Sequence, residues 1–160
     1  GNGFQPGDTS RRALFIGGGI GVPPLLEAAK PFGPNAVLAA GFRSRSAVIL
    51  EDDFNAAGCR VRIATDDGSL GHRGLVTDLA NDLAFDVIFA CGPKPMLRAV
   101  SLLAEKRGVP CQVSLEERMA CGIGACLGCA VRLRGESGEH YGHVCKDGPV
   151  FDSRNVVWEA

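Results

Sequence analysis

The chain has 160 residues and a formal net charge of −1, a length that suits one ordinary domain with a small appended module. This charge balance provides no basic field for a nucleic acid or an anionic membrane surface, and no apolar run is long enough for a transmembrane helix. The seven cysteines are an odd number, which argues against complete disulfide pairing and favours a reducing, cytoplasmic location.

Short apolar runs alternate with helix-like segments through the first two thirds of the chain. Each run ends at a turn rich in Gly, Asp or Pro, which is the pattern of a buried strand. Strands are predicted at residues 13–16, 36–42, 59–65, 85–90 and 110–115. Helices are predicted from Pro23 onwards and at residues 46–57, 75–83 and 95–107. This alternation predicts an α/β fold, with a five-stranded parallel sheet and helices on both of its faces.

The alternation of strands and helices stops near residue 117. A segment rich in glycine and cysteine follows, then strand-like pieces at residues 130–134, near His143 and at residues 156–157. We therefore predict an α/β domain over residues 1–117. Residues 118–160 are predicted to form a small module that is held by metal rather than by a large core.

Four cysteines near the C-terminus have the spacing of a plant-type 2Fe-2S cluster. Cys121, Cys126 and Cys129 form a C-x4-C-x2-C run, and Cys145 follows downstream; this is the pattern of such clusters. The residues between the first three are small or apolar, and glycines among them allow backbone N–H groups to approach the sulfides. The sequence therefore predicts a 2Fe-2S cluster on these four cysteines.

Other uses of four cysteines fit the sequence less well. A four-cysteine zinc site usually shows two C-x2-C knuckles, whereas only Cys126 and Cys129 form one here. A disulfide framework requires an oxidising compartment. A Rieske centre requires two histidines that are each placed close to a cysteine, whereas His140 and His143 flank only Cys145. The spacing favours a 2Fe-2S cluster, with zinc as the alternative.

Three glycine-rich features follow predicted strands, at the sheet edge where open parallel sheets bind ligands. They are the turn at residues 17–21, the loop at residues 66–74 and the tripeptide at residues 91–93. The first departs from the dinucleotide fingerprint, since Pro24 stands where a small residue is usual, but its backbone N–H groups can still receive a pyrophosphate. Alone, it could also be only a tight turn. The candidate nucleotide-binding residues are Gly17, Gly18, Gly19, Ile20, Gly21, Arg43, Asp66, Asp67, Gly92 and Pro93.

Cofactor preference and the role of Cys91 each have two interpretations. Arg43 and Arg45 could pair with a 2′-phosphate and so favour NADP, or they could lie on a solvated loop, while Asp66 and Asp67 are the acidic residues nearby. Cys91 precedes Gly-Pro at a predicted strand end, where a nicotinamide ring could lie. We take it as the candidate catalytic residue, although a free cysteine is most often a small buried hydrophobe.

These motifs together resemble a known family. Residues 17–24 followed by Cys91-Gly92-Pro93 look like the pyridine-nucleotide half of the ferredoxin-NADP reductase superfamily. Residues 115–129, with residues 144–149 downstream, are more specific. They resemble the electron-transfer subunit of B-type dihydroorotate dehydrogenase, in which a 2Fe-2S module follows the pyridine-nucleotide-binding domain. The resemblance covers nearly the whole chain.

The resemblance implies a path for electrons in pyrimidine biosynthesis. In that family, electrons leave dihydroorotate at an FMN in a partner catalytic subunit, cross the 2Fe-2S cluster to an FAD, and reduce NAD. Carried onto this sequence, the turn at residues 17–21 would take the pyrophosphate, and Cys91 with Gly92 would border the nicotinamide. The resemblance further implies NAD rather than NADP, and a heterotetramer with the FMN-containing catalytic subunit.

The family's FAD-binding barrel is signalled by an Arg-x-Tyr-Ser/Thr motif. Tyr141 is the single tyrosine and has a different context, so we expect an N-terminal domain outside this sequence to hold most of the FAD. Nicotinamides transfer two electrons as hydride and a 2Fe-2S centre takes one, so a flavin must convert between them. The chain alone is therefore expected to be inactive.

Two other functions compete with this one. The first is a subunit of another flavin/2Fe-2S NAD(P)H reductase, of the sulfide dehydrogenase or hydrogenase type; some of these replace one cluster cysteine with Asp. The second is a nucleotide-binding regulatory module with a structural zinc on the same four cysteines. On the cluster loop, Ile123 and Leu127 could either face a partner or shield the cluster from water.

Overall fold

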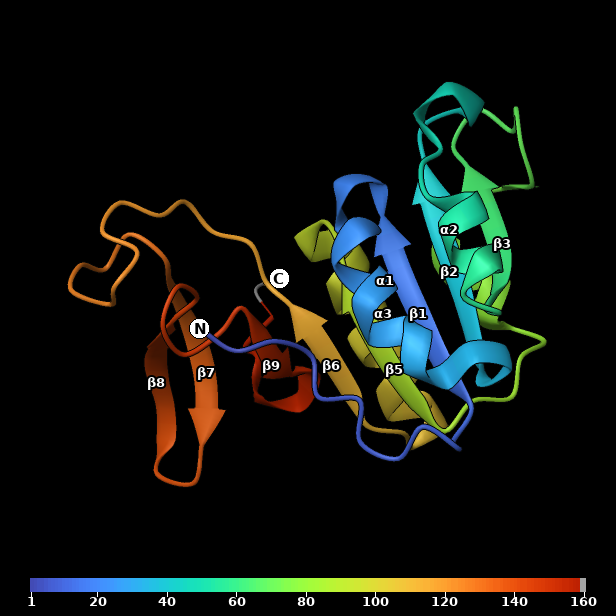
Figure 1. The fold of residues 1–160 in the computed structure, drawn as a ribbon. Helices are drawn as coiled ribbons and strands as arrows, with labels where there is room; N and C mark the ends of the chain where they lie inside the picture. The colour runs from blue at the N-terminus through green and yellow to red at the C-terminus, as the bar shows by residue number, and fades with distance from the viewer. Residues whose placement is uncertain (159–160) are drawn as a thin grey trace.

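The computed structural model describes residues 1–158, and a seven-stranded sheet forms its centre (Figure 1). The strand order is β4-β3-β2-β1-β5-β6-β9. All neighbouring strands are parallel except β9, which pairs antiparallel with β6. The predicted α/β class is confirmed, and the five predicted strands are parallel, but the sheet has seven strands because β4 and the antiparallel β9 extend its two edges. The strands are β1 (Ala13–Gly18), β2 (Ala36–Phe42), β3 (Arg60–Thr65), β4 (His72–Arg73), β5 (Val87–Cys91), β6 (Cys111–Ser114) and β9 (Val150–Asp152).

Helices cover both faces of this sheet (Figure 1). On one face, α1 (Pro23–Ala29) and α2 (Glu51–Ala56) bury a cluster that includes Phe15, Phe54 and Phe89. On the other, α3 (Lys94–Arg107) covers a cluster that includes Leu14 and Leu97. Leu14 and Phe15 alternate between the faces because successive strand residues point to opposite sides. No helix of residues 1–158 has the length and hydropathy to cross a membrane.

Two predicted helices are shorter in the structure. Residues 75–83 form only a 3-10 helix, η4 (Val76–Ala80). At its start, the carboxylate of Asp78 accepts the backbone N–H of Leu75. After its end, the N–H of Leu83 donates to the carbonyl oxygen of Ala80, so the chain turns there instead of continuing as an α-helix. The helix predicted at residues 46–57 breaks at Leu50, which has a φ of 62°. The other 3-10 helices are η1 (Gly19–Gly21), η2 (Lys30–Asn35), η3 (Arg45–Ala47) and η5 (Ser153–Asn155).

The C-terminal part adds a separate hairpin. Strands β7 (Ala130–Gly135) and β8 (Gly138–His143) pair antiparallel, and the loop at residues 116–129 projects away from the large sheet (Figure 1). The chain then returns to the large sheet through β9, and the sequence did not predict this strand. Residues on both sides of position 117 thus contribute to one sheet, and the division at that position stays a prediction.

Candidate cluster loop and nucleotide cleft

Three of the four predicted cluster cysteines lie on the loop at residues 116–129. Within it, the backbone N–H of Cys126 donates to the sulfur of Cys121, and the N–H of Gly128 donates to the sulfur of Cys126, both at 3.4 Å. Cys145 comes from the turn after β8, and this turn is joined to the loop where the N–H of Val144 donates to the carbonyl oxygen of Cys129 at 3.1 Å. The fold thus brings together cysteines that are 24 positions apart.

The four sulfurs form two pairs. The side chain of Cys121 interacts with that of Cys126, and the side chain of Cys145 with that of Cys129. Within residues 1–158, no three His, Cys, Asp or Glu side chains converge on a single ion position. A 2Fe-2S cluster needs no such group, because each of its two irons takes two protein ligands. The residues present therefore fit a binuclear iron site.

The thiols differ in acidity. Backbone N–H groups of Ile123 and then Cys126 lower the pKa of Cys121 to about 6, so this thiol is largely a thiolate at neutral pH, the form that binds metal. The pKa of Cys145 is raised, first by its interaction with the Cys129 thiol and then by desolvation. A bound metal would offset this rise in pKa, because its positive charge favours the deprotonated thiol.

A cleft of about 840 Å³ lies at the carboxyl ends of the central strands, a volume typical of small-molecule and cofactor sites. Arg43 and Asp66 reach it from the ends of β2 and β3, and Cys91 from the end of β5. The structure thus brings most of the predicted residues to one place. The predicted residues in its lining are Gly18, Gly19, Ile20, Gly21, Arg43, Asp66, Cys91, Gly92 and Pro93.

Two predicted residues lie outside this lining. Gly17 is buried against Val22, where a β-carbon would come within 2.7 Å of the Val22 side chain. The carboxylate of Asp67 accepts the backbone N–H of Ser69 at 2.9 Å and its hydroxyl at 2.6 Å. That hydroxyl oxygen in turn accepts the N–H of Arg45. Both residues therefore shape loops beside the cleft.

Cys91 lies half-buried beside β6. Its register partner is Ser114, whose side chain hydrogen-bonds to it. Burial raises the pKa of the Cys91 thiol; the hydrogen bond with Ser114 offsets part of this rise, and the carboxylate of Glu116 adds to it. The neutral thiol therefore dominates at pH 7, and it suits a packing contact better than a nucleophile.

Sequence reasoning missed the contributions of Ser114, Leu115 and Glu116, and of Met96 in α3, to the cleft. The available signal was the pairing of β5 with β6, because adjacent parallel strands end at the same edge of the sheet. A prediction that placed residues 110–115 beside Cys91 would have found Ser114 and its successors.

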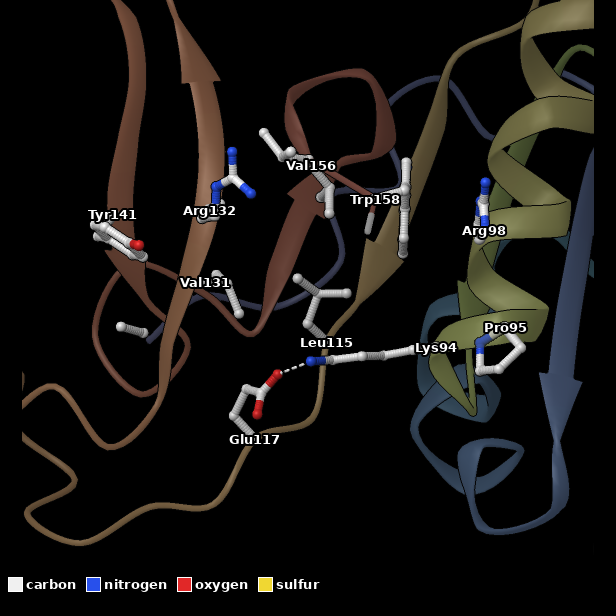
Figure 2. Close-up of a pocket in the computed structure, with 12 residues that line it drawn as sticks. Lys94, Pro95, Arg98, Leu115, Glu117, Val131, Arg132, Tyr141, Val156 and Trp158 are labelled. Carbon is white, nitrogen blue, oxygen red and sulfur yellow. Dashed lines mark ion pairs between the residues drawn. The ribbon is translucent and has the colours of Figure 1, made fainter. Parts of the chain in front are cut away.

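A second cavity of about 410 Å³ separates the hairpin from α3 (Figure 2). Leu115 lines this cavity and also lines the nucleotide cleft. Lys94, the first residue of α3, forms an ion pair with Glu117 at the start of the cluster loop (Figure 2). This pair therefore joins the start of α3 to the start of the cluster loop.

Comparison with known proteins shows what the chain is similar to. Residues 116–157 match the model of the iron-sulfur cluster binding domain of dihydroorotate dehydrogenase B. Over 164 residues, the chain is 49% identical to the electron transfer subunit of dihydroorotate dehydrogenase B (NAD(+)) of Bacillus caldolyticus, covering 98% of this chain and 62% of that protein. The chain is a homologue of dihydroorotate dehydrogenase B electron transfer subunits.

A further relative shows the same similarity. The corresponding subunit of Caldanaerobacter subterraneus is 44% identical over 161 residues, covering 99% of this chain and 64% of that protein. The chain thus spans slightly less than two thirds of the length of these dihydroorotate dehydrogenase B subunits.

Solved structures agree on the fold. An NADH-dependent reduced ferredoxin-NADP oxidoreductase, studied for flavin-based electron bifurcation, superposes with a TM-score of 0.76 at 33% identity, covering 91% of this chain and 54% of that one. The C-terminal domain of a hydrogenase from Pyrococcus furiosus has a TM-score of 0.51 at 18% identity, covering 68% of this chain and 93% of that one, and shows the fold alone.

Proposed function

We propose that this chain is the NAD-binding and cluster-bearing part of a dihydroorotate dehydrogenase B electron transfer subunit. The proposal depends most on the paired arrangement of the four cysteines. Three of them lie on a loop that starts at the nucleotide cleft, and the fourth, Cys145, lies on the turn that is hydrogen-bonded to this loop. Glu116 lines the cleft, and Cys121 follows five positions later in the same loop. When bound on Cys121, Cys126, Cys129 and Cys145, a 2Fe-2S cluster would supply one-electron transfer.

In this proposal the cleft holds NAD. The turn at residues 18–21 offers backbone N–H groups to the pyrophosphate, and Asp66 accepts ribose hydroxyls from the end of β3. Cys91 and Gly92 border the nicotinamide, and burial keeps the Cys91 thiol neutral beside it by raising its pKa. Arg43 lines the same cleft, but the names of the relatives specify NAD, and we assign NAD as the cofactor.

The remaining cofactor and partner follow from the family. We assign most of the FAD contacts to an N-terminal domain outside residues 1–160, because the Arg-x-Tyr-Ser/Thr motif is not found in this sequence. The partner in this proposal is an FMN-containing catalytic subunit that oxidises dihydroorotate, and two copies of each subunit form a heterotetramer. The proposed location is the cytoplasm.

The isolated chain should not transfer electrons from NADH to its cluster. Nicotinamide donates a hydride and the cluster takes one electron, so a flavin is needed between them. Anaerobic mixing of the cluster-loaded chain with NADH, followed by visible absorption, tests this point. We expect bleaching when a flavoprotein reductase is added and none with NADH alone; rapid bleaching without flavin would contradict the assignment.

One observation favours a second function. The oxidoreductase of TM-score 0.76 is 33% identical over 91% of this chain, so another flavin/2Fe-2S NAD(P)H reductase is the competing assignment. Anaerobic addition of dihydroorotate, with and without an FMN-containing dihydroorotate dehydrogenase subunit, separates the two. Our proposal predicts cluster bleaching only when that subunit is present. A chain that neither binds the subunit nor is bleached supports the competing reductase.

A further inference from the structure

The first five residues form a strap that runs from the hairpin side of the molecule to the large sheet (Figure 1). Asn2 forms an isolated parallel bridge with Pro149, just before β9. Phe4 packs edge-on against Phe89 of β5, with ring centroids 5.9 Å apart. Gln5 then pairs with Gln112 of β6. The strap therefore contacts both the segment that follows Cys145 and the nucleotide-binding sheet.

Asn2 forms hydrogen bonds to residues 147–150 through its backbone N–H and through both polar atoms of its side-chain amide. Its backbone N–H donates to the carbonyl oxygen of Gly148 at 2.6 Å, and its side-chain Nδ2 donates to that of Asp147 at 3.1 Å. Its Oδ1 accepts the N–H of Val150, also at 3.1 Å. Three hydrogen bonds from one residue thus fix residues 147–150.

The segment that Asn2 holds is the end of the turn that carries Cys145. The carbonyl oxygen of His143 accepts the N–H groups of Lys146, Asp147 and Gly148, at 3.1, 2.8 and 3.3 Å. The carboxylate of Asp147 closes the turn by accepting the N–H of His143 at 2.7 Å. Because these bonds enclose Cys145 in one turn, a shift of residues 147–148 would be transmitted to its sulfur.

The strap has a second anchor that provides an internal comparison. The side chain of Gln112 accepts the N–H of Gln5 at 2.9 Å and donates to the carbonyl oxygen of Gln5 at 2.8 Å. It therefore makes two side-chain hydrogen bonds to the strap, as many as Asn2 makes to the Cys145 segment. Gln112 lies in β6, and neither of these side-chain hydrogen bonds reaches the turn.

We propose that Asn2 is a positioning residue for the fourth cluster ligand, Cys145. This inference rests on the proposed 2Fe-2S cluster. Cys121, Cys126 and Cys129 share one loop, whereas Cys145 comes from a different turn, so the closure of the site depends on how that turn is held. Asn2 holds it from a part of the chain that is 143 positions away in sequence.

The test compares Asn2→Ala with Gln112→Ala in the full chain, since each substitution removes two side-chain hydrogen bonds. The rate of iron loss to a chelator and the midpoint potential and EPR spectrum of the reduced cluster are measured. Asn2→Ala should lose iron about five- to thirtyfold faster than wild type and shift the potential or the EPR spectrum. Gln112→Ala should match wild type in both.

Asn2→Asp provides a second variant, because its carboxylate can still accept the N–H of Val150 but its other oxygen would face the carbonyl oxygen of Asp147, which is also an acceptor. Its rate of iron loss should be at least as fast as that of Asn2→Ala. Equal iron loss and identical spectra in the Asn2 and Gln112 variants would overturn the positioning role. A wild-type chain that takes up no iron would overturn the proposed cluster, and this inference with it.

Discussion

A β-carbon on Gly21 would lie 2.2 Å from the carbonyl oxygen of Cys91. The glycine turn after β1 and the end of β5 therefore touch through their backbones. Both segments line the nucleotide cleft, and their separation sets its width at the position proposed for the pyrophosphate and nicotinamide.

Gly21→Ala should force these segments apart. We expect a loss of about 1–3 kcal/mol in the free energy of unfolding, as for other overpacked positions, and at least a roughly tenfold weaker affinity for NADH. Urea unfolding and calorimetric titration measure the two effects. Gly108→Ala is the control: Gly108 follows α3 outside the cleft lining, has a φ of +64°, and a β-carbon there would have no heavy atom within 4 Å, so about 1–2 kcal/mol of backbone strain and unchanged NADH affinity are expected. Equal NADH affinity in Gly21→Ala and wild type would contradict this reasoning.

Cys126 and Cys111 should respond differently to removal of the thiol. Cys111 is buried in β6, and desolvation raises its pKa to about 12, so it is neutral and packs as a small hydrophobe. Cys111→Ala should keep the full iron content and lose about 1 kcal/mol of stability. Cys126→Ala should lose the cluster. Iron analysis and urea unfolding of both variants check this, and full iron content in Cys126→Ala would contradict the ligand assignment.

The ion pair of Arg12 with Asp86 should affect acid stability. The two residues precede β1 and β5, and the Arg12 side chain followed by its backbone N–H lowers the pKa of Asp86 to about 2. Because the folded pKa lies below the ordinary value of about 3.9, this contribution is complete above about pH 4 and is lost as the pH falls towards about 2. Asp86→Asn should reduce stability at pH 7 and flatten the pH dependence across this acid range. Urea midpoints across the same range measure it; parallel curves for the two proteins would contradict the prediction.

Asp66 and Arg43 should have opposite effects on cofactor preference. Both line the cleft, and an acidic residue at this edge suits the ribose hydroxyls of NAD whereas an arginine suits a 2′-phosphate. Asp66→Asn should weaken NADH binding about tenfold. Arg43→Ala should leave NADH binding within about twofold and weaken residual NADPH binding. Calorimetry with both cofactors tests this, and tighter binding of NADPH than NADH by wild type would reverse the NAD assignment.

Residues 36–42 illustrate what the sequence could predict. This apolar run between a proline-rich turn and Arg43 became β2 with the same bounds, because a fully buried parallel strand leaves a continuous apolar signal. The four other predicted strands were also found. The 2Fe-2S spacing was equally local, since Cys121, Cys126 and Cys129 lie within nine positions.

The features that the sequence did not predict depend on distant partners. Strand β9 has three residues and exists only because Val113 of β6 pairs with Phe151. The short η4 reflects contacts of Asp78 with Leu75 and His72 rather than helix propensity. The strap residue Asn2 carries no motif of its own, and its role emerges only from its contacts with residues 147–150.

The most direct test of this account is the visible absorption spectrum of the anaerobically purified chain, with iron, sulfide and zinc assayed on the same sample. A brown protein with about two irons and two sulfides per chain, bleached by dithionite, is the predicted result. A colourless protein with one zinc per chain and no iron would contradict the electron-transfer assignment and support the structural zinc site.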